Sequence, residues 1–439
     1  MTPHGLIRVL LLVLTASTAA TPAFAQAGRN ERPYRGLFGD SRATLTSSIS
    51  TFGGYDLLTT NQSSLGTTVS RDSGAIYGGV NGTLSYHRPV GKVSFDASGA
   101  TNMHLYRQTS DAALRSHTTS GQMGIGIPVL RRAQWRAAQS FSASSYYNFS
   151  PFGLFNPLDV EDLPLPSSDA RVAGGRTYDY RAFSSFGVAV GRYDTISADG
   201  SGRRLWGVDD APTLTTVGGG ARWARRVARA WTTQVGYGYE QGLAEKGRSA
   251  GGLHRIDAGA SYAAPLSFSR RTRLAAFFGA SMASYSIGDN PSRSINVPQV
   301  VGSATVSHQL GRTWSLGGAY SRQFRFSELT VNPTFTTSAL MSLQGLPARR
   351  IGLTFSGGYA TSTLDAGRSA RSFHSLIGSA RSQVGLSRSF ALSAEYSYYA
   401  FAGTSSGAGT GRVLETDIGR HAVRVGLSAW VPLLKPRGQ

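Results

Sequence analysis

Short segments in which apolar and polar residues alternate recur along almost the whole chain. In the segment 312–326, the even positions are mostly apolar and include Phe324 and Phe326, whereas odd positions such as Gln323 and Arg325 are small or polar. Successive side chains of a β-strand point to opposite faces, so such a segment has one apolar face and one wettable face. Many strands of this kind without helices cannot all pack on a soluble core. The pattern predicts a transmembrane β-barrel with lipid outside and water inside.

The first 25 residues have the features of a secretory signal peptide. Arg8 precedes the apolar run 10–14, and small residues at Ala23 and Ala25 provide a cleavage site before Gln26. The apolar run is too short to span a membrane, and no later segment holds about 18 apolar residues in a row. We therefore expect export by the general secretory pathway. The mature chain would then begin with a short periplasmic segment, 26–40.

The composition limits the remaining classes. The sequence has no cysteine, so an exported fold of this size must be held by its own hydrogen-bond ladder, as a closed barrel is. The formal net charge is +20, from 44 Lys+Arg against 24 Asp+Glu, but the basic residues are spread over turns and polar faces. This distribution argues against nucleic acid as a partner. It favours contact with anionic lipid and lipopolysaccharide of an outer membrane, because arginine suits phosphate recognition.

Connections between the predicted strands alternate in length. Short, mostly basic turns are predicted at 88–91, 130–132, 225–227, 269–271, 310–312, 347–349 and 387–389. Longer polar connections are predicted at 55–73, 106–116, 149–176, 243–251, 286–297, 327–333, 363–371 and 403–417. Short turns at one end and long connections at the other are typical of outer-membrane barrels, in which the short turns are periplasmic.

The predicted barrel occupies residues 41–434, with a periplasmic tail at 435–439. With both termini in the periplasm the strand number must be even. Counting a weak strand at 192–198 gives about 18 strands, and 16 is the alternative. The fold class predicted from the sequence is therefore all-β, a closed antiparallel transmembrane β-barrel.

The last predicted strand, 419–433, resembles the C-terminal signal recognised by the bacterial barrel-assembly machinery. Polar Arg424 and Gly426 are followed by Ala429 and Val431 at the matching spacing. With the alternating strands, this resemblance identifies the chain as similar to the porin-like β-barrel proteins of the Gram-negative outer membrane. It implies an outer-membrane location, with the assembly machinery and periplasmic chaperones as partners.

No motif predicts a cofactor, a metal site or an enzyme. The sequence has no phosphate-binding loop and no histidines at metal-ligand spacing. The His-x-Ser pattern of outer-membrane phospholipases is absent. The acidic doublets 161–162 and 209–210 have no histidine nearby in sequence, unlike the His–Asp couple expected of omptin-like proteases.

Charged residues of both signs are predicted on the wettable faces, with arginine in excess. The candidate lumen charges are Arg42, Lys92, Asp96, Arg136, Arg181, Arg222, Glu240, Arg255, Asp257, Arg350, Arg381, Glu395, Arg420 and Arg424. Charges of both signs create transverse fields, and an excess of arginine favours anions. The alternative is that these residues only form ion pairs that stabilise a water-filled wall.

The connection 149–176 is the longest and is unusually apolar for an exposed loop. Its acidic part contains Asp159, Glu161 and Asp162. Long loops in compact folds are often functional. This segment resembles the third loop of general porins, which folds into the lumen and sets acidic groups against arginines. A surface flap or lid is the alternative.

The favoured function is a passive channel for small polar or anionic solutes, because barrels of about 16–18 strands leave an aqueous bore. Two other functions stay open: a partner-dependent barrel for export or surface presentation of polysaccharide, and a non-conducting structural or adhesive barrel. A second copy of the chain is a further candidate partner, as in oligomeric porins.

Overall fold

The computed structural model describes most of the predicted barrel. The described residues are 45–64, 67–90, 93–108, 113–144, 177–207, 213–243, 249–262, 264–266, 269–286, 294–326, 333–364, 371–387, 389–406 and 413–434. Several predictions fall outside them and stay predictions: the signal peptide 1–25, the segment 26–40, Arg42, Lys92, the tail 435–439, and the candidate loop with Asp159, Glu161 and Asp162.

Almost all of the described residues belong to β-strands. These are β1 (Leu45–Ser64), β2 (Thr67–Val90), β3 (Val93–Gln108), β4 (Ala113–Leu130), β5 (Ala133–Ser144), β6 (Thr177–Ala189), β7 (Asp194–Gly207), β8 (Leu214–Arg226), β9 (Trp231–Leu243), β10 (Ser249–Tyr262), β11 (Ala264–Leu266), β12 (Ser269–Ser286), β13 (Ser294–Leu310), β14 (Trp314–Phe326), β15 (Pro333–Ala348), β16 (Ile351–Leu364), β17 (Arg371–Gly385), β18 (Phe390–Ser406) and β19 (Val413–Leu434). A search of the described residues finds no helix with the length and apolar character needed to span a membrane.

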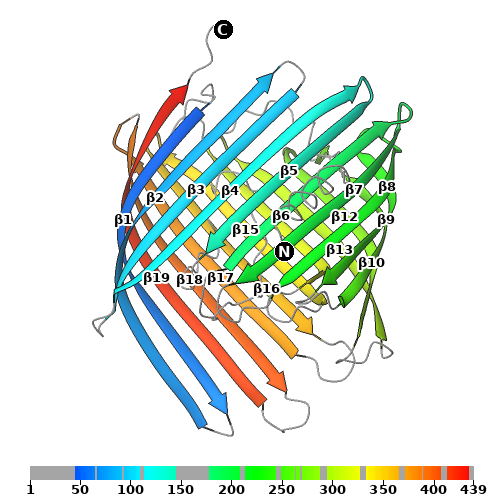
Figure 1. Cartoon of the computed structure of the whole chain (residues 1–439). Helices are drawn as coiled ribbons and strands as arrows, with labels where there is room; N and C mark the ends of the chain where they lie inside the picture. Colours follow the sequence, from blue (N-terminus) through cyan, green and yellow to red (C-terminus); the bar gives the residue numbers. More distant parts are fainter. Residues whose placement is uncertain are drawn as a thin grey trace, which may run out of the picture.

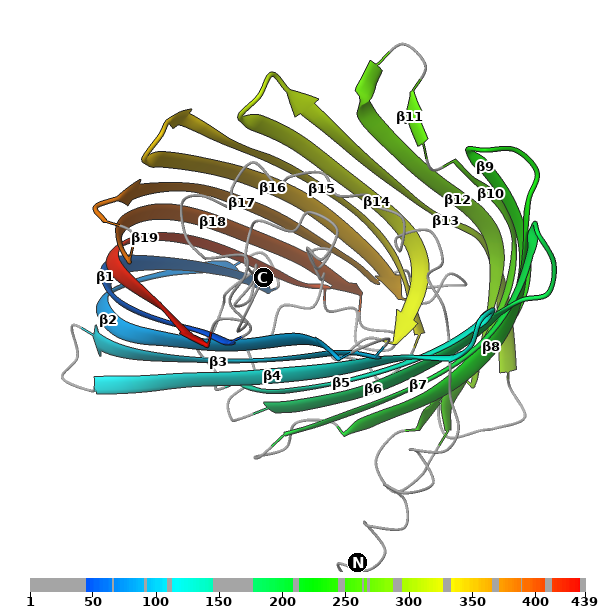
Figure 2. The same cartoon turned by 90° about the horizontal axis from the view of Figure 1, so that it is seen from above.

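The strands close into one antiparallel barrel, seen from the side in Figure 1 and from above in Figure 2. Neighbours in sequence pair with each other, and β1 pairs with β19 from Leu45 opposite Leu434 to Ser63 opposite Glu415, which closes the ring. Because β10 and the short β11 both pair with β12, they act as one broken strand, and the barrel has 18 strands. The predicted closed barrel and its strand number are confirmed. The weak strand predicted at 192–198 overlaps the start of β7, which begins at Asp194.

The two ends of the barrel differ in the length of their connections. At the end of the barrel where β1 begins and β19 ends, tight turns such as 131–132 and 349–350 join the strands. At the opposite end the connections are generally longer, and the one between β5 and β6 covers 145–176. The predicted asymmetry is confirmed. We call these the short-turn end, at the top of Figure 1, and the long-connection end.

The predicted connection 55–73 is wrong. β1 and β2 stay paired as far as Ser64 opposite Thr67, so only residues 65–66 separate the two strands. The sequence is polar here, but main-chain hydrogen bonding does not require apolar side chains and continues past the apolar part of the wall. The wall therefore extends further around β1, β2 and β19, which are 20, 24 and 22 residues long, than around β6 and β8, which have 13 each.

The apolar side chains of the wall lie mainly on its outer surface. Ile76, Val300 and Phe278 are 67%, 66% and 64% exposed, and their sequence neighbours point toward the bore. Such a surface would be unfavourable in water and suits the hydrocarbon of a bilayer, in which a closed barrel leaves few polar backbone groups unpaired. The chain folds as an outer-membrane-type β-barrel.

The wall departs from a regular barrel between β13 and β14. Their ladder runs from Leu310 opposite Trp314 only as far as Gly302 opposite Arg322, although both strands continue beyond it. β14 stays paired with β15 up to its last residue, Phe326. At the long-connection end, the end of β14 therefore leaves β13 while it stays paired with β15, which is itself paired with β16 as far as Phe335 opposite Thr363. Figure 2 shows the yellow end of β14 curling into the bore.

Apolar contacts hold this curled end against the inner face of the wall between β7 and β13. The cluster consists of Phe324 and Phe326 with Leu205, Leu214, Leu253 and Ala283, and Val297 and Phe335 pack against it. Phe324 is only 8% exposed and Phe326 only 6%. The prediction that these two rings face lipid is wrong. Because the strand end leaves the wall, its apolar face turns toward inward-pointing side chains of β7, β8, β10 and β12.

Candidate functional site: the charged wall of the lumen

One group of charges spans three neighbouring strands near the seam of the barrel. Arg381 on β17 lies opposite Glu395 on β18, which lies opposite Arg424 on β19. The Nη2 of Arg424 donates a 2.6 Å hydrogen bond to Oε2 of Glu395, and Nε of Arg381 lies 3.9 Å from the same oxygen. Arginine stays protonated, so two guanidinium groups around one carboxylate leave one positive charge in excess. We call this group the Glu395 triad.

Alternation places the Glu395 triad on the inner wall. Tyr396 and Val423, which are 41% and 49% exposed, lie opposite each other on the outer face, and the triad residues beside them point inward. The guanidinium carbon of Arg424 also lies 5.6 Å from the ring centroid of Phe52 on β1. This distance is within the range of a cation–π contact, so the aromatic ring helps to fix the direction of the guanidinium group.

An ion pair links β1 and β19, the first and last strands, across the seam where the barrel closes. The Nε of Arg420 on β19 donates to both carboxylate oxygens of Asp56 on β1, at 2.8 and 2.9 Å, and its Nη2 also pairs with this carboxylate. The two side chains are 12% and 8% exposed, so the pair is nearly buried. A buried charge is costly unless it is paired, and here each charge has an opposite partner.

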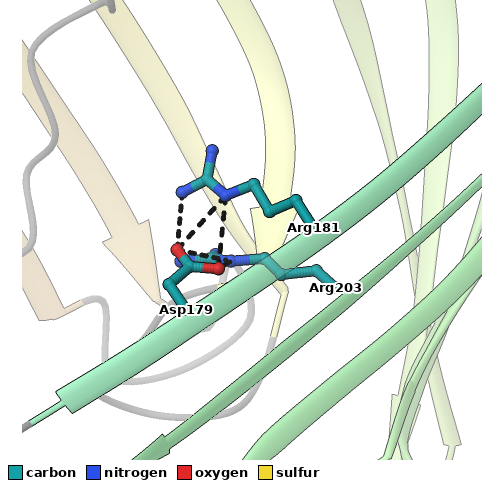
Figure 3. A network of polar contacts seen from close by, with 3 residues as sticks. All are labelled: Asp179, Arg181 and Arg203. Carbon is teal, nitrogen blue, oxygen red and sulfur yellow. Dashed lines mark hydrogen bonds and ion pairs between the residues drawn. The ribbon is translucent and has the colours of Figure 1, made fainter. Parts of the chain in front are cut away.

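A second triad lies on β6 and β7 and is drawn in Figure 3. The Nη2 atoms of Arg181 and Arg203 both donate 2.7 Å hydrogen bonds to Oδ2 of Asp179. The arginine side chains differ in exposure, at 59% for Arg181 and 20% for Arg203. One carboxylate again lies between two guanidinium groups, so this Asp179 triad also carries one positive charge in excess.

Glycines make room for further charges on β7 to β10. A Cβ added to Gly220 would lie 2.9 Å from Oδ1 of Asp199, and one added to Gly236 would lie 3.2 Å from Cβ of Arg222. Gly238 lies opposite Arg255 in the ladder. The missing side chains let long charged residues lie along the inner wall, which explains the glycines at alternate positions of β8 and β9.

Most of the predicted lumen charges lie on the inner wall. Those that alternation places there are Asp96, Arg136, Arg181, Arg222, Glu240, Arg255, Arg381, Glu395, Arg420 and Arg424. The structure brings Arg381, Glu395 and Arg424 into direct contact. Asp96 lies over Gly124, where an added Cβ would fall 2.8 Å from its Oδ2.

Two of the predicted lumen residues in the described ranges are not among those placed on the inner wall. Arg350 lies in the tight turn between β15 and β16 and not on the wall, because β16 begins only at Ile351. That placement corrects the prediction of a lumen charge at this position. Asp257 lies on β10 opposite Gly236, and its side chain is outside the described part of the structure.

The residues of the predicted assembly signal all lie on β19. Arg424 and Gly426 point to the bore, whereas Val431 is 49% exposed on the outer face. Ala429 lies opposite Phe390, which is also on the outer face. Whether this strand is recognised during assembly stays a prediction.

Three charged residues of the site were not singled out from the sequence. Asp56 was missed because its segment was predicted to be a connection, so neither face was assigned. Asp179 and Arg203 were missed because they lie near the long connection, on parts of β6 and β7 where apolar and polar residues do not yet alternate regularly. The even spacing of Phe52, Gly54 and Asp56 along β1 is a signal that could have shown the inward face.

No family model matches the chain, and no curated protein matches its sequence. Solved structures that align with it include the FrpB iron transporter from Neisseria meningitidis (F3-3 variant), with a TM-score of 0.39 and 8% identity over 86% of this chain and 81% of that one. Pseudomonas aeruginosa OccK5 (OpdH) has a TM-score of 0.39 and 11% identity over 90% of this chain and 99% of that one. For Acinetobacter baumannii OccAB3 the TM-score is 0.38, with 10% identity over 87% and 99%. At these TM-scores, the alignments carry no argument about function.

The chemistry that the inner wall can support is binding and steering of ions. Among the described residues, no group of three His, Cys, Asp or Glu side chains could hold a metal ion. The two triads instead present arginines, whose planar donors suit carboxylates and phosphates. Each triad is held in place by its own central carboxylate.

Proposed function

We propose that the protein is a porin-like channel of the bacterial outer membrane through which small polar or anionic solutes diffuse passively. The observation that carries the proposal is the pair of arginine-rich triads on the inner wall of an 18-stranded barrel. Barrels of this strand number are wide enough for an aqueous bore. Each triad leaves one positive charge in excess, and positive charge on a low-dielectric wall raises the local concentration of anions.

The outer surface supports the membrane location. Three exposed tyrosine–histidine pairs join neighbouring strands on the outer face, with oxygen–nitrogen distances of 2.8, 2.9 and 2.8 Å: Tyr237 with His254, Tyr359 with His374, and Tyr396 with His421. Amphipathic aromatic side chains are typical of the level of the lipid head groups. We propose lipid and lipopolysaccharide as the surroundings of the outer face, after export by the general secretory pathway. The barrel-assembly machinery and periplasmic chaperones are the proposed partners during insertion.

Single-channel recording tests the proposal directly. Refolded protein is added to a planar bilayer, and the reversal potential is measured in a salt gradient. We expect discrete conductance steps and a reversal potential that indicates preference for anions. A correctly folded barrel that gives no steps would overturn the channel function and favour partner-dependent export, a structural role or an enzyme.

A matched pair of variants tests whether the triads cause the selectivity. Replacing Arg381→Gln together with Arg424→Gln removes two positive charges from the bore. Replacing Arg131→Gln together with Arg132→Gln removes the same number from an exposed turn at the short-turn end. The first variant should lose most of the anion preference and the second should keep it. Equal loss in both would mean that net charge, and not the inner wall, sets the selectivity.

A further inference from the structure

The curled end of the β14–β15 hairpin, residues 323–326 and 333–336, is a candidate moving element. Because Phe335 and Thr336 also pair with Thr363 and Ser362, the end of β16 moves with it. We infer that this end is a gate with two positions: folded into the bore, as in this structure, and paired with β13 in the wall. The inference rests on the proposed channel function for its effect on conductance. The movement itself has a separate structural readout.

The sequence of β14 suits the wall position. Continuing the β13–β14 register beyond Gly302 opposite Arg322 would place Phe324 opposite Val300, which is 66% exposed on the outer face. The next odd residue, Arg325, would come opposite Gln299 and point into the bore. The alternating pattern therefore continues correctly through Phe326 as a lipid-facing strand. No slip of register is needed for the hairpin to rejoin the wall.

The inner wall suits the folded position equally well. Leu205, Leu214 and Leu253 are only 2%, 1% and 6% exposed, although their strand positions point toward a bore that otherwise carries polar groups. Apolar side chains at such positions need an apolar partner to exclude water. Phe324 and Phe326 are that partner. A Cβ added to Gly242 on β9 would lie 2.4 Å from Cε1 of Phe326, so the glycine leaves the space that the ring occupies.

The edge of β13 explains why the folded position is not the only stable one. In the described residues, Ser294–Val301 pair with β12 but lie beyond the end of the ladder with β14. Unpaired main-chain groups at a strand edge are unfavourable next to lipid, which favours return of β14 to the wall. Pro298 lies within this edge and lacks a main-chain donor, and proline in a sheet is found at edges. The edge of β13 is therefore suited to a state in which β14 is not paired with it.

Arg322 marks the point at which the two strands separate. Its guanidinium carbon lies 4.9 Å from the ring centroid of Phe335 on β15, so this contact moves with the hairpin and not with β13. Beyond Arg322, rotation of the paired ends of β14, β15 and β16 would carry the rings from the inner cluster to the outer face. Arg325 lies on the face of β14 opposite the rings, so the same movement would bring it next to Gln299 on the inner face of β13.

Engineered disulfides test the movement, because the chain has no cysteine of its own. The test variant is Gln299→Cys with Arg325→Cys, two positions that would be direct neighbours only in the wall position. The control variant is Thr305→Cys with Ala319→Cys, a pair already opposite each other in the same two strands. Directly opposite residues of antiparallel strands have Cα atoms at distances compatible with a disulfide. Both pairs are oxidised in lipid vesicles and scored by gel mobility and mass spectrometry.

We expect the control pair to cross-link in the resting protein and the test pair to cross-link more slowly, as the hairpin visits the wall. The oxidised test variant should be open about ten times more often than its reduced form, and reduction should reverse the change. A control pair that forms while the test pair never forms would overturn the gate. A test pair that forms without any change in conductance would overturn its gating role.

A third outcome separates this inference from the channel function. If both pairs cross-link and neither the parent nor any variant conducts, the two positions of the hairpin are supported and the passive channel fails. A second variant, Phe324→Leu with Phe326→Leu, weakens the inner cluster while keeping the outer face apolar. When the test cysteines at 299 and 325 are added to this variant, they should cross-link faster than in the parent. An unchanged rate would show that the apolar cluster does not hold the hairpin in the bore.

Discussion

The ring of Phe326 on β14 lies against Gly242 on the inner face of β9, away from its own place in the sheet. A Cβ on Gly242 would fall 2.4 Å from Cε1 of the ring, which is closer than such atoms approach one another. This contact joins two strands that are separated in the wall by β10, β12 and β13. One glycine on the inner wall therefore makes room for the folded end of the hairpin.

Replacing Gly242→Val should displace the hairpin from the bore. Overfilling a packed site costs about 1–3 kcal/mol, and about 1.4 kcal/mol corresponds to a tenfold change in an equilibrium. We expect the open fraction in single-channel recordings to rise about tenfold. Gly238→Ala is the control, because a Cβ at that position would meet its nearest atom at 3.7 Å, an ordinary contact. Unchanged gating in Gly242→Val would show that Phe326 does not close the bore.

The end of β14 also shows what period-two alternation can and cannot predict. The alternation assigned Phe324 and Phe326 to one apolar face, and that assignment of a shared face was right. It could not distinguish lipid from the apolar part of the inner wall, because both environments favour the same side chains. The distinction depends on where the β13–β14 ladder stops, at Gly302, and this is a long-range property that no local pattern contains.

The Glu395 triad predicts a specific change in ion selectivity. Replacing Glu395→Gln keeps the size of the side chain but removes the negative charge between Arg381 and Arg424. The reversal potential should move further toward anion preference, with a permeability ratio changed about fivefold if the added net charge contributes about 1 kcal/mol. Asp194→Asn is the control, since Asp194 lies where β7 begins at the short-turn end and is 4.0 Å from Arg225. A shift of equal size in both variants would contradict a local effect of the triad.

The seam pair predicts a loss of stability. Replacing Asp56→Asn takes the carboxylate away from Arg420, whose side chain is only 12% exposed. Removing one partner of a buried pair costs about 3–5 kcal/mol, because the remaining buried charge loses that opposite charge. The midpoint of urea unfolding in lipid vesicles should fall accordingly. The double variant Asp56→Asn with Arg420→Gln should recover part of the loss, and a double variant less stable than the single one would argue against this account.

Residues of the inner wall differ in how far the sequence could predict them. Glu395 and Arg424 lie in the middle of strongly alternating strands, so their inward direction followed from their neighbours. That they meet Arg381 on one carboxylate depends on the stagger between three strands, which the sequence does not show. Asp56 was not predicted because its polar surroundings indicated a loop. Arg350 was misplaced by one residue at the start of β16, which is enough to move a residue from the wall to a turn.

The Asp179 triad allows a comparison of two arginines bound to the same oxygen. Arg181 and Arg203 each donate at 2.7 Å to Oδ2 of Asp179, but Arg181 is 59% exposed and Arg203 is 20% exposed. Arg181→Gln should change stability by less than about 1 kcal/mol, because exposed pairs are screened by water. Arg203→Gln should cost about 1–2 kcal/mol more, because a less exposed charged hydrogen bond is lost.

Selectivity should respond differently from stability in the same two variants. Each substitution removes one positive charge from the same part of the bore, so both should reduce the anion preference by a similar amount. The reduction should be larger at low salt, because charges are screened over about 10 Å at 0.1 M. Urea unfolding and reversal potentials measured on both proteins would separate the two effects. If only Arg203→Gln changed the selectivity, the exposed guanidinium of Arg181 would play no part in attracting anions. The excess positive charge of the Asp179 triad would then not be what sets the selectivity.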